Sequence, residues 1–150
     1  MTDTAGREIV TERLIDAPRE LVFDAWIDPA QVVEWWGPDG FTNTIYEMDV
    51  RPGGVWRFVM HGPDGTDYQN KIVFVEIVRP ERIVYDHVST PFFRNTVTFQ
   101  EERGKTRVRM HAVMESAEVR DRTIKVFKAD EGGRQTLGRL AAFVEKRSSR

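Results

Sequence analysis

The sequence predicts an α+β fold in which a curved antiparallel sheet of about six to seven strands wraps around a long C-terminal helix. Short segments in which apolar and polar residues alternate, joined by tight turns, occupy most of residues 42–114. Helix signals are confined to the run Ala17–Gly37 and to the last third of the chain. Because the last helix has an apolar stripe and the sheet has an apolar face, each is expected to bury the other.

The first strand is followed by a predicted pair of short helices. The strand is expected over Glu8–Ile15, where apolar and polar residues alternate weakly. Pro18 suits the first position of a helix, because its missing N–H group would have no partner there. Asp28 is expected to cap a second helix, with Gln31 at the spacing of a capping box. Gly37 supplies a left-handed stop at the end of that helix.

The remaining strands are expected between turn signals. Gly53-Gly54 and Arg103-Gly104-Lys105 favour hairpins between neighbouring strands. The expected strands are Thr42–Val50, Val55–His61 and segments around residues 68–74, 83–88, 97–99 and 107–115. Charged and apolar residues alternate most cleanly in the last of these, so one face of the sheet is expected to meet water and the other the interior.

The last third of the chain is predicted to be helical. Ser116 is expected to cap a helix of about one to three turns, and Asp130 to cap the long C-terminal helix. The apolar stripe of the long helix contains Gly133, Leu137, Leu140, Ala141 and Val144. Gly132 and Gly133 each cost about 1 kcal/mol relative to alanine inside a helix. We expect a close approach to the sheet, or room for a ligand, to offset that cost.

Composition argues against nucleic acid and membranes as partners. The chain has 22 basic and 24 acidic residues and a net charge of -2, so no bulk field attracts an anionic polymer or surface. The absence of cysteine excludes disulfides and thiolate chemistry. No apolar stretch approaches the roughly 20 residues of a membrane span. The polar N-terminus lacks an apolar signal region, which predicts a cytoplasmic location.

Length and surface pattern bear on domain organisation and assembly. We expect one domain over residues 1–150, with flexible tails at 1–7 and 147–150. Val73, Val75 and Val84 are expected on the outer face of the sheet. Scattered surface apolar residues are normal, so both a monomer and a homodimer remain open.

The inward face of the predicted sheet is rich in aromatic and methionine side chains. Such residues with a few polar atoms are typical of small-molecule pockets, although the same pattern also suits a solid core. The candidate ligand-binding residues on the sheet are Tyr46, Met48, Trp56, Phe58, Met60, Tyr68, Asn70, Tyr85, His87, Phe99, Met110 and Met114. Gly133 and Leu137 of the long helix and Trp35 complete the candidate set.

Two groups in this set carry specific expectations. Buried polar side chains such as Asn70, Tyr85 and His87 must either satisfy one another or orient a polar group of a ligand, and His87 is the best single candidate. Trp35 and Trp36 are about 100° apart on a helix and cannot both face the core. Trp36 is expected in the core, and Trp35 at the pocket rim or on a partner surface.

No metal, cofactor or catalytic constellation is predicted. His61 and His111 alternate in the opposite phase from the pocket set, and no carboxylate pair joins them at the spacing of metal ligands. Glu76 follows Phe74 in the inward phase but lies near a strand end, where solvent is expected, and Asp86 is expected to point outward. No acid–base pair is therefore expected inside the pocket. We therefore assign no catalytic residue and favour a binding protein over an enzyme.

The motifs of this chain resemble those of the activator of Hsp90 ATPase homologue 1-like (AHSA1-like) domain. This domain belongs to the START-like, or SRPBCC, superfamily of Bet v 1-like helix-grip folds. The matching segments are Ala17–Trp26, Asp28-Pro29, Glu34–Pro38, Met48–Trp56 and Glu131–Gly133 with Leu137 and Leu140. The resemblance covers nearly the whole chain and implies the helix-grip fold. Members are variously ligand carriers, cyclases, resistance proteins and chaperone regulators, so the fold does not dictate the activity.

Three functions therefore stand as hypotheses. The first is binding of a hydrophobic or aromatic small molecule between the sheet and the C-terminal helix, by a carrier or sensor of a lipid, polyketide or other metabolite. The second, implied by the resemblance, is modulation of an Hsp90-type chaperone or a general stress response. It ranks lower because the chain has no room for the second domain of larger activators. The third is a cofactor-free cyclase or hydrolase.

Overall fold

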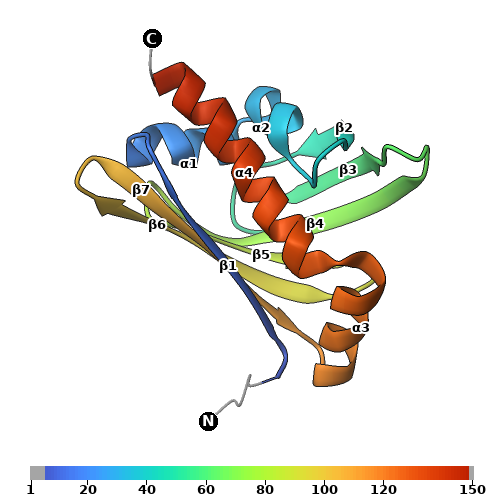
Figure 1. The fold of residues 1–150 in the computed structure, drawn as a ribbon. Helices are drawn as coiled ribbons and strands as arrows, with labels where there is room; N and C mark the ends of the chain where they lie inside the picture. The colour runs from blue at the N-terminus through green and yellow to red at the C-terminus, as the bar shows by residue number, and fades with distance from the viewer. Residues whose placement is uncertain (1–5, 149–150) are drawn as a thin grey trace.

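The computed structural model describes residues 6–148, which form a seven-stranded antiparallel sheet and helices on its concave side (Figure 1). The strand order across the sheet is β1-β7-β6-β5-β4-β3-β2. The strands are β1 (Glu8–Ile15), β2 (Thr42–Met48), β3 (Val55–His61), β4 (Asp67–Val78), β5 (Arg82–His87), β6 (Phe93–Glu102) and β7 (Lys105–Met114). The helices are α1 (Arg19–Ile27), α2 (Pro29–Trp35), α3 (Ala117–Phe127) and α4 (Ala129–Ser148). The predicted α+β architecture is confirmed.

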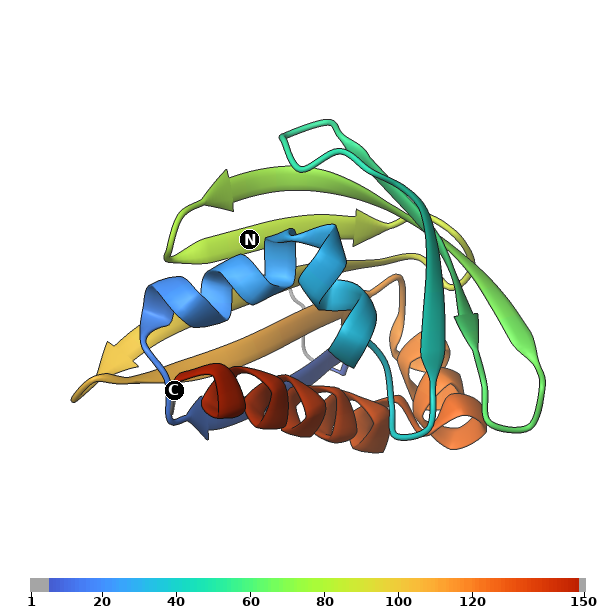
Figure 2. The ribbon, with the colours of Figure 1, turned by 90° about the horizontal axis from the view of Figure 1, so that it is seen from above.

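The helices fill the hollow of the curved sheet. Figure 2 shows α1, α2 and α4 inside the curve, while α3 lies at one end, where it contacts α4, β1 and β7. Leu137, Leu140, Ala141 and Val144 of α4 are all buried, as the predicted stripe requires. Burying this stripe against the apolar face of the sheet removes both from water. This is the helix-grip arrangement.

Turns and bulges set the curvature and the register of the sheet. The β6–β7 turn uses Arg103 at φ 53° and Gly104 at φ 79°, two positive φ values that match the twist of a tight hairpin. The register shifts between Ile45 and Glu47 in β2 and between Phe74 and Glu76 in β4. Such bulges bend a strand and reverse its inward and outward phase from that point.

The predicted junction between the first two helices is confirmed, with one difference. The Asp28 carboxylate accepts hydrogen bonds from the Ala30 N–H at 3.1 Å and from the Gln31 side-chain amide at 3.0 Å. In a capping box Gln31 would instead reach the Asp28 N–H. That N–H already donates to the Asp24 carbonyl at 3.1 Å in the last turn of α1. The two helices therefore share Asp28, and this fixes the angle between them.

The expectation for the two adjacent tryptophans was wrong. Trp35 is buried at 1% exposure, and its ring N–H donates to the Ala25 carbonyl at 3.1 Å. Trp36 is only partly buried. The prediction placed both residues on one helix, but α2 ends at Trp35 and Trp36 is extended, with φ -64° and ψ 133°. The side chain of Trp36 therefore leaves the helical face and packs toward Trp56, at 4.9 Å between ring centroids.

The start of the long helix also differs from the prediction. Ser116 caps α3 as expected, accepting from the Val119 N–H at 3.1 Å. Lys128 then adopts the left-handed conformation, with φ 51°, and α4 begins directly at Ala129. Asp130 therefore lies in the first turn of α4 and is not its cap. Its charge still favours the positive end of the helix dipole.

The chain ends of the described region lie against the core structure. The backbone N–H of Met114 donates to the Arg7 carbonyl at 2.8 Å, and the Arg7 guanidinium donates to the Met114 carbonyl at 3.0 Å. Arg147 belongs to α4. The remaining parts of the expected tails, 1–5 and 149–150, lie outside the described residues. Within residues 6–148, no helix is long and apolar enough to cross a membrane.

One glycine of α4 is explained by how closely the helix approaches β1. A methyl group built on Gly133 would lie 2.8 Å from Thr11 Oγ1, closer than a normal contact. A methyl group on Gly138 would meet only Arg13 Nη1, at an ordinary 3.7 Å. Close approach thus accounts for Gly133, and Gly133 also faces the cavity described below.

This difference predicts opposite outcomes for the same substitution at two positions of one helix. Gly138→Ala should raise the free energy of unfolding by about 0.5–1 kcal/mol, because alanine restricts the unfolded chain and favours the helix. Gly133→Ala should raise the free energy of unfolding by less than Gly138→Ala does, or should lower it, because the added methyl group forces Thr11 to move. Urea denaturation of both variants measures the comparison. Equal gains at the two positions would contradict the close approach of Gly133 to β1.

Candidate functional site

A cavity of about 820 Å³ lies between the sheet and the α3–α4 junction. Its walls come from β1 and β3 to β7, from the segment 36–41 after α2, and from the adjoining ends of α3 and α4. The opposite half of the hollow is filled by packed side chains, chiefly around Trp26, Trp35 and Phe99. The sheet and α4 therefore enclose a solid core at one end and an open space at the other.

Most of the sequence-predicted site residues meet at this cavity. Those that line it come from four strands and from α4, and they are Phe58, Met60, Tyr68, Asn70, Tyr85, His87, Met110, Met114 and Gly133. The strand residues are separated widely in the chain but share the concave face, because side chains two residues apart in a strand point the same way. Strand alternation was sufficient to find them, and the apolar stripe of the long helix identified Gly133.

The other predicted residues do not line the cavity. Some belong to the solid core, and those of β2 are displaced by a bulge. Trp35, Trp56, Phe99 and Leu137 are buried at 1–2% exposure in the solid core and do not line the cavity. Alternation identifies an inward face but cannot say whether that face meets side chains or open space.

The prediction was wrong for the inner face of β2 because of its bulge. Tyr46 is 58% exposed on the outer side, where the Arg57 guanidinium lies 5.3 Å from its ring centre. Ile45 and Met48 turn inward in its place and pack against the core, not the cavity. The register shift between Ile45 and Glu47 separates the two phases.

Sequence reasoning missed several cavity residues. Asn95 lies directly opposite Tyr85 in the β5–β6 pair, and its alternation with Val97 and Phe99 would have revealed it. Trp36 reaches the cavity only because α2 ends one residue earlier. Val126 and Phe127, at the mouth, come from the last turn of α3 and remain 61% and 59% exposed. Nothing in their local sequence signals this position.

One side chain of α4 holds the cavity wall formed by residues 36–38. Arg139 Nη1 donates to the carbonyl oxygens of Trp36, Gly37 and Pro38 at 3.3, 3.0 and 2.9 Å. Burial lowers the pKa of Arg139, and Asp39 partly offsets the effect. Arginine nevertheless stays charged at any physiological pH, so these are charge-assisted bonds. We call this group of contacts the Arg139 clasp.

His87 is tied to protein groups through both ring nitrogens. Nδ1 lies 2.8 Å from the Pro91 carbonyl oxygen, and Nε2 lies 2.7 Å from the Asn70 side-chain oxygen and 3.3 Å from Ser89 Oγ. Burial lowers the pKa of His87, and the hydrogen bond to Pro91 partly offsets this. The ring is therefore neutral near pH 7 and carries one hydrogen. With that hydrogen on Nδ1, the ring donates to the Pro91 carbonyl, and Nε2 accepts from the Ser89 hydroxyl, because the Asn70 oxygen cannot donate. His87 offers a ligand its ring, which stacks on Phe93 at 4.7 Å, and not a free nitrogen.

Tyr85 and Asn95 form a second polar pair in the middle of the sheet. The Asn95 amide donates to the Tyr85 hydroxyl at 2.8 Å, and both side chains are buried, at 4% and 2% exposure. Burial raises the pKa of Tyr85 to about 12, with the Asn95 hydrogen bond working in the opposite direction. Tyr85 therefore keeps its hydroxyl proton at neutral pH and acts as a hydrogen-bonding group, not as a base.

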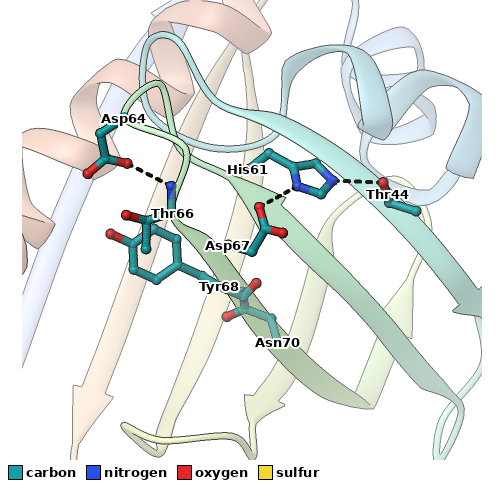
Figure 3. Close-up of polar contacts among 7 residues, drawn as sticks. All are labelled: Thr44, His61, Asp64, Thr66, Asp67, Tyr68 and Asn70. Atoms are coloured by element: carbon teal, nitrogen blue, oxygen red, sulfur yellow. Dashed lines mark hydrogen bonds and ion pairs between the residues drawn. The ribbon is translucent and has the colours of Figure 1, made fainter.

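The rim of the cavity at the β3–β4 hairpin is polar and internally bonded (Figure 3). His61 Nδ1 lies 2.7 Å from Asp67, and His61 Nε2 lies 2.8 Å from the Thr44 hydroxyl. Asp64 accepts from the Thr66 N–H at 3.0 Å inside the turn. The expected outward phase of His61 agrees with these contacts. Within residues 6–148, no cluster of three histidine or carboxylate side chains is placed to hold a metal ion.

Carboxylates outside the cavity are paired with arginines. Arg82 donates to Glu76, and this hydrogen bond lowers the pKa of Glu76. Asp86 accepts from Arg94 at 2.7 and 2.9 Å on the outer face, as its predicted outward phase requires. Neither Glu76 nor Asp86 lines the cavity. A carboxylate on the outer face of the sheet is out of reach of a molecule held inside and cannot serve as its acid or base.

The family model of "Activator of Hsp90 ATPase homolog 1-like protein" matches residues 16–145, nearly the whole chain. The chain belongs to this family. This AHSA1-like domain has no match among curated proteins. The family resemblance inferred from the motifs around Ala17–Pro38 and Glu131–Leu140 is thereby confirmed.

Solved structures of low sequence identity share the fold of this AHSA1-like domain. A protein from Nitrosomonas europaea is 20% identical with a TM-score of 0.86, covering 99% of this chain and 100% of its own. One from Arthrobacter aurescens is 23% identical with a TM-score of 0.87, covering 97% and 90%. An AHSA1 protein from Silicibacter pomeroyi is 20% identical with a TM-score of 0.74, covering 93% and 99%. At such identities the likeness shows the fold alone.

The buried state of Tyr85 makes a prediction for the AHSA1-like domain at high pH. Because the pKa of Tyr85 rises from 10.0 to about 12 on folding, its contribution to stability is present below pH 10 and lost between pH 10 and 12. In a tyrosinate absorbance titration, one of the three tyrosines should ionise only near pH 12 or on unfolding. Tyr85→Phe should remove this late step. Full ionisation of all three in the folded protein well below pH 12 would show that Tyr85 is accessible.

Proposed function

We propose that this AHSA1-like domain binds a neutral, largely apolar small molecule in the cavity between the sheet and the α3–α4 junction. The observation that carries this proposal is a volume of about 820 Å³, open at its mouth, whose lining includes the aromatic rings of Phe58, Tyr85 and Phe93 and the side chains of Met60, Met110 and Met114. Ligand pockets of roughly 300–1,000 Å³ with such walls hold drug-sized molecules. A fold stabilised only by packing would be expected to fill this space, because interiors are close-packed.

The charges around the cavity support a neutral ligand. Asp39, Asp67, Lys128 and Glu131 line the cavity, and all four are exposed to solvent at its mouth. His87 is neutral near pH 7 because burial lowers its pKa. A charge carried to the inner end would lose its hydration without gaining an ionic partner, which is costly. A carrier or sensor of an apolar metabolite fits these conditions.

A substitution that fills the cavity tests the proposal. Ala112 lines the cavity from the middle of β7, between Ile9 of β1 and Asn95 of β6. Ala112→Phe should occupy ligand space and weaken the binding of methylpyrene, an apolar fluorescent probe, by about tenfold or more, equivalent to about 1.4 kcal/mol. Fluorescence titration measures the affinity.

Ala142→Phe is the matched control, because Ala142 is exposed on α4 away from the cavity. It should leave the affinity for methylpyrene unchanged. The proposal fails if the wild-type protein binds no apolar probe. It also fails if Ala112→Phe and Ala142→Phe have the same effect on binding, since the probe would then sit elsewhere.

The family name provides a second candidate function, modulation of an Hsp90-type chaperone. The rate of ATP hydrolysis by such a chaperone, measured with and without this domain, separates the two functions. A change in rate that persists in Ala112→Phe would support an interaction surface independent of the cavity. An unchanged rate, with no co-elution of the two proteins, would exclude this candidate.

A further inference from the structure

The inner wall of the cavity contains a buried polar atom without a protein partner. The side-chain oxygen of Asn95 is fully covered and accepts no hydrogen bond from the described residues. Other buried side-chain atoms of this kind, such as the ring nitrogens of Trp26 and Trp56, belong to residues that do not line the cavity. A buried acceptor without a partner costs about 1–3 kcal/mol. Asn95 lines the cavity, so this acceptor lies in the cavity wall.

Tyr85 adds an unused donor beside this unused acceptor. The Tyr85 oxygen accepts a hydrogen bond from the Asn95 amide at 2.8 Å, so the hydroxyl hydrogen of Tyr85 remains available for a different acceptor. No such acceptor is found among the described residues. In the reverse orientation of the Asn95 amide, the Tyr85 hydroxyl would donate to the oxygen and leave the amide hydrogens and a hydroxyl lone pair unused. In both cases the pair offers at least one donor and at least one acceptor.

The neighbouring polar groups are already engaged. The hydroxyls of Thr123 and Thr136 donate to carbonyls one turn earlier in their own helices, at 2.7 and 2.8 Å. Both nitrogens of His87 face protein oxygens. The Tyr85–Asn95 pair is therefore a buried polar feature of the cavity that a ligand can complete. It sits at the centre of the sheet, since β5 is the middle strand of the order.

We propose that the ligand carries a neutral hydroxyl group held between Tyr85 and Asn95, so that the ligand class is an apolar alcohol or phenol. The inference rests on the proposed function and specifies its chemistry. A hydroxyl group donates one hydrogen bond and accepts others through a single oxygen, which matches the pair in either amide orientation. An ether or ketone only accepts, and a carboxylate would bring an unpaired charge into a site without a cation.

A series of pyrene derivatives tests this proposal in the intact protein. Pyrenemethanol and methylpyrene differ by one hydroxyl group, and pyrenecarboxylate replaces it with a charge. The key quantity is the Kd of methylpyrene divided by the Kd of pyrenemethanol, measured by fluorescence titration. In the double variant Tyr85→Phe/Asn95→Leu this ratio should fall by about tenfold relative to wild type, because both hydrogen bonds to the ligand are lost.

Both partners are replaced together because removing only one would leave the other buried and unpaired. Tyr46→Phe is the matched control, since it removes a tyrosine hydroxyl on the outer face of the sheet. The ratio of the two Kd values measured for Tyr46→Phe should equal that of the wild-type protein. Should the double variant fail to fold, the methyl ether of pyrenemethanol applies the same test to the wild-type protein. The ether cannot donate and should bind about fivefold or more weakly than the alcohol.

The outcomes separate the inference from the function on which it rests. If both neutral probes bind and the ratio of their Kd values is the same in wild type and in the double variant, the hydroxyl site is overturned. The proposal of an apolar binding cavity is then still supported. Tightest binding by pyrenecarboxylate would overturn it in favour of an anion site. Absence of binding by every probe would overturn the proposed function and the inference together.

Discussion

The aromatic cluster of four tryptophans is the constraint on which the rest of the structure depends. Trp26 contacts Trp35 and Trp36 at 5.0 and 5.7 Å between ring centres, and Trp36 continues to Trp56 at 4.9 Å. These edge-to-face contacts join α1, α2 and the sheet, and each adds to the gain from burial alone. The cluster fixes how far the helix pair sits from the sheet. Trp36 contacts the other tryptophans and also lines the cavity, so it lies at the boundary between the solid core and the open space.

The cavity combines an apolar wall with few, well-placed polar groups, and this limits the chemistry it can perform. His87 is neutral and bonded on both sides, and Tyr85 holds its proton up to about pH 12. Groups held by protein partners in this way can orient a bound molecule through ring contacts and hydrogen bonds. The ionised carboxylates lie at the mouth or on the outer face. Recognition by shape and by hydrogen bonds is therefore the chemistry that the site supports.

The sequence predicts the fold and much of the cavity wall because both follow from periodicity. Alternation in β4, β5 and β7 places residues such as Asn70, His87 and Met110 correctly, since a strand keeps its phase over its length. It fails at Tyr46, where a bulge inserts a residue, and at Trp36, where the helix ends one residue early. Neither event has a signal in local composition. The division between solid core and open space, which separates Trp56 from Phe58, depends on packing among distant segments and cannot be seen in one strand.

The Arg139 clasp has a consequence for how this scaffold can diversify. All three of its bonds at Trp36, Gly37 and Pro38 are made to backbone carbonyls, so the clasp does not depend on which side chains those positions carry. The φ of 101° at position 37 favours glycine there, whereas position 38 has no positive φ that would restrict its residue type. A substitution at Pro38 can therefore reshape the cavity while the wall stays in place. Evolution or a protein engineer can exchange ligand specificity here without rebuilding the fold.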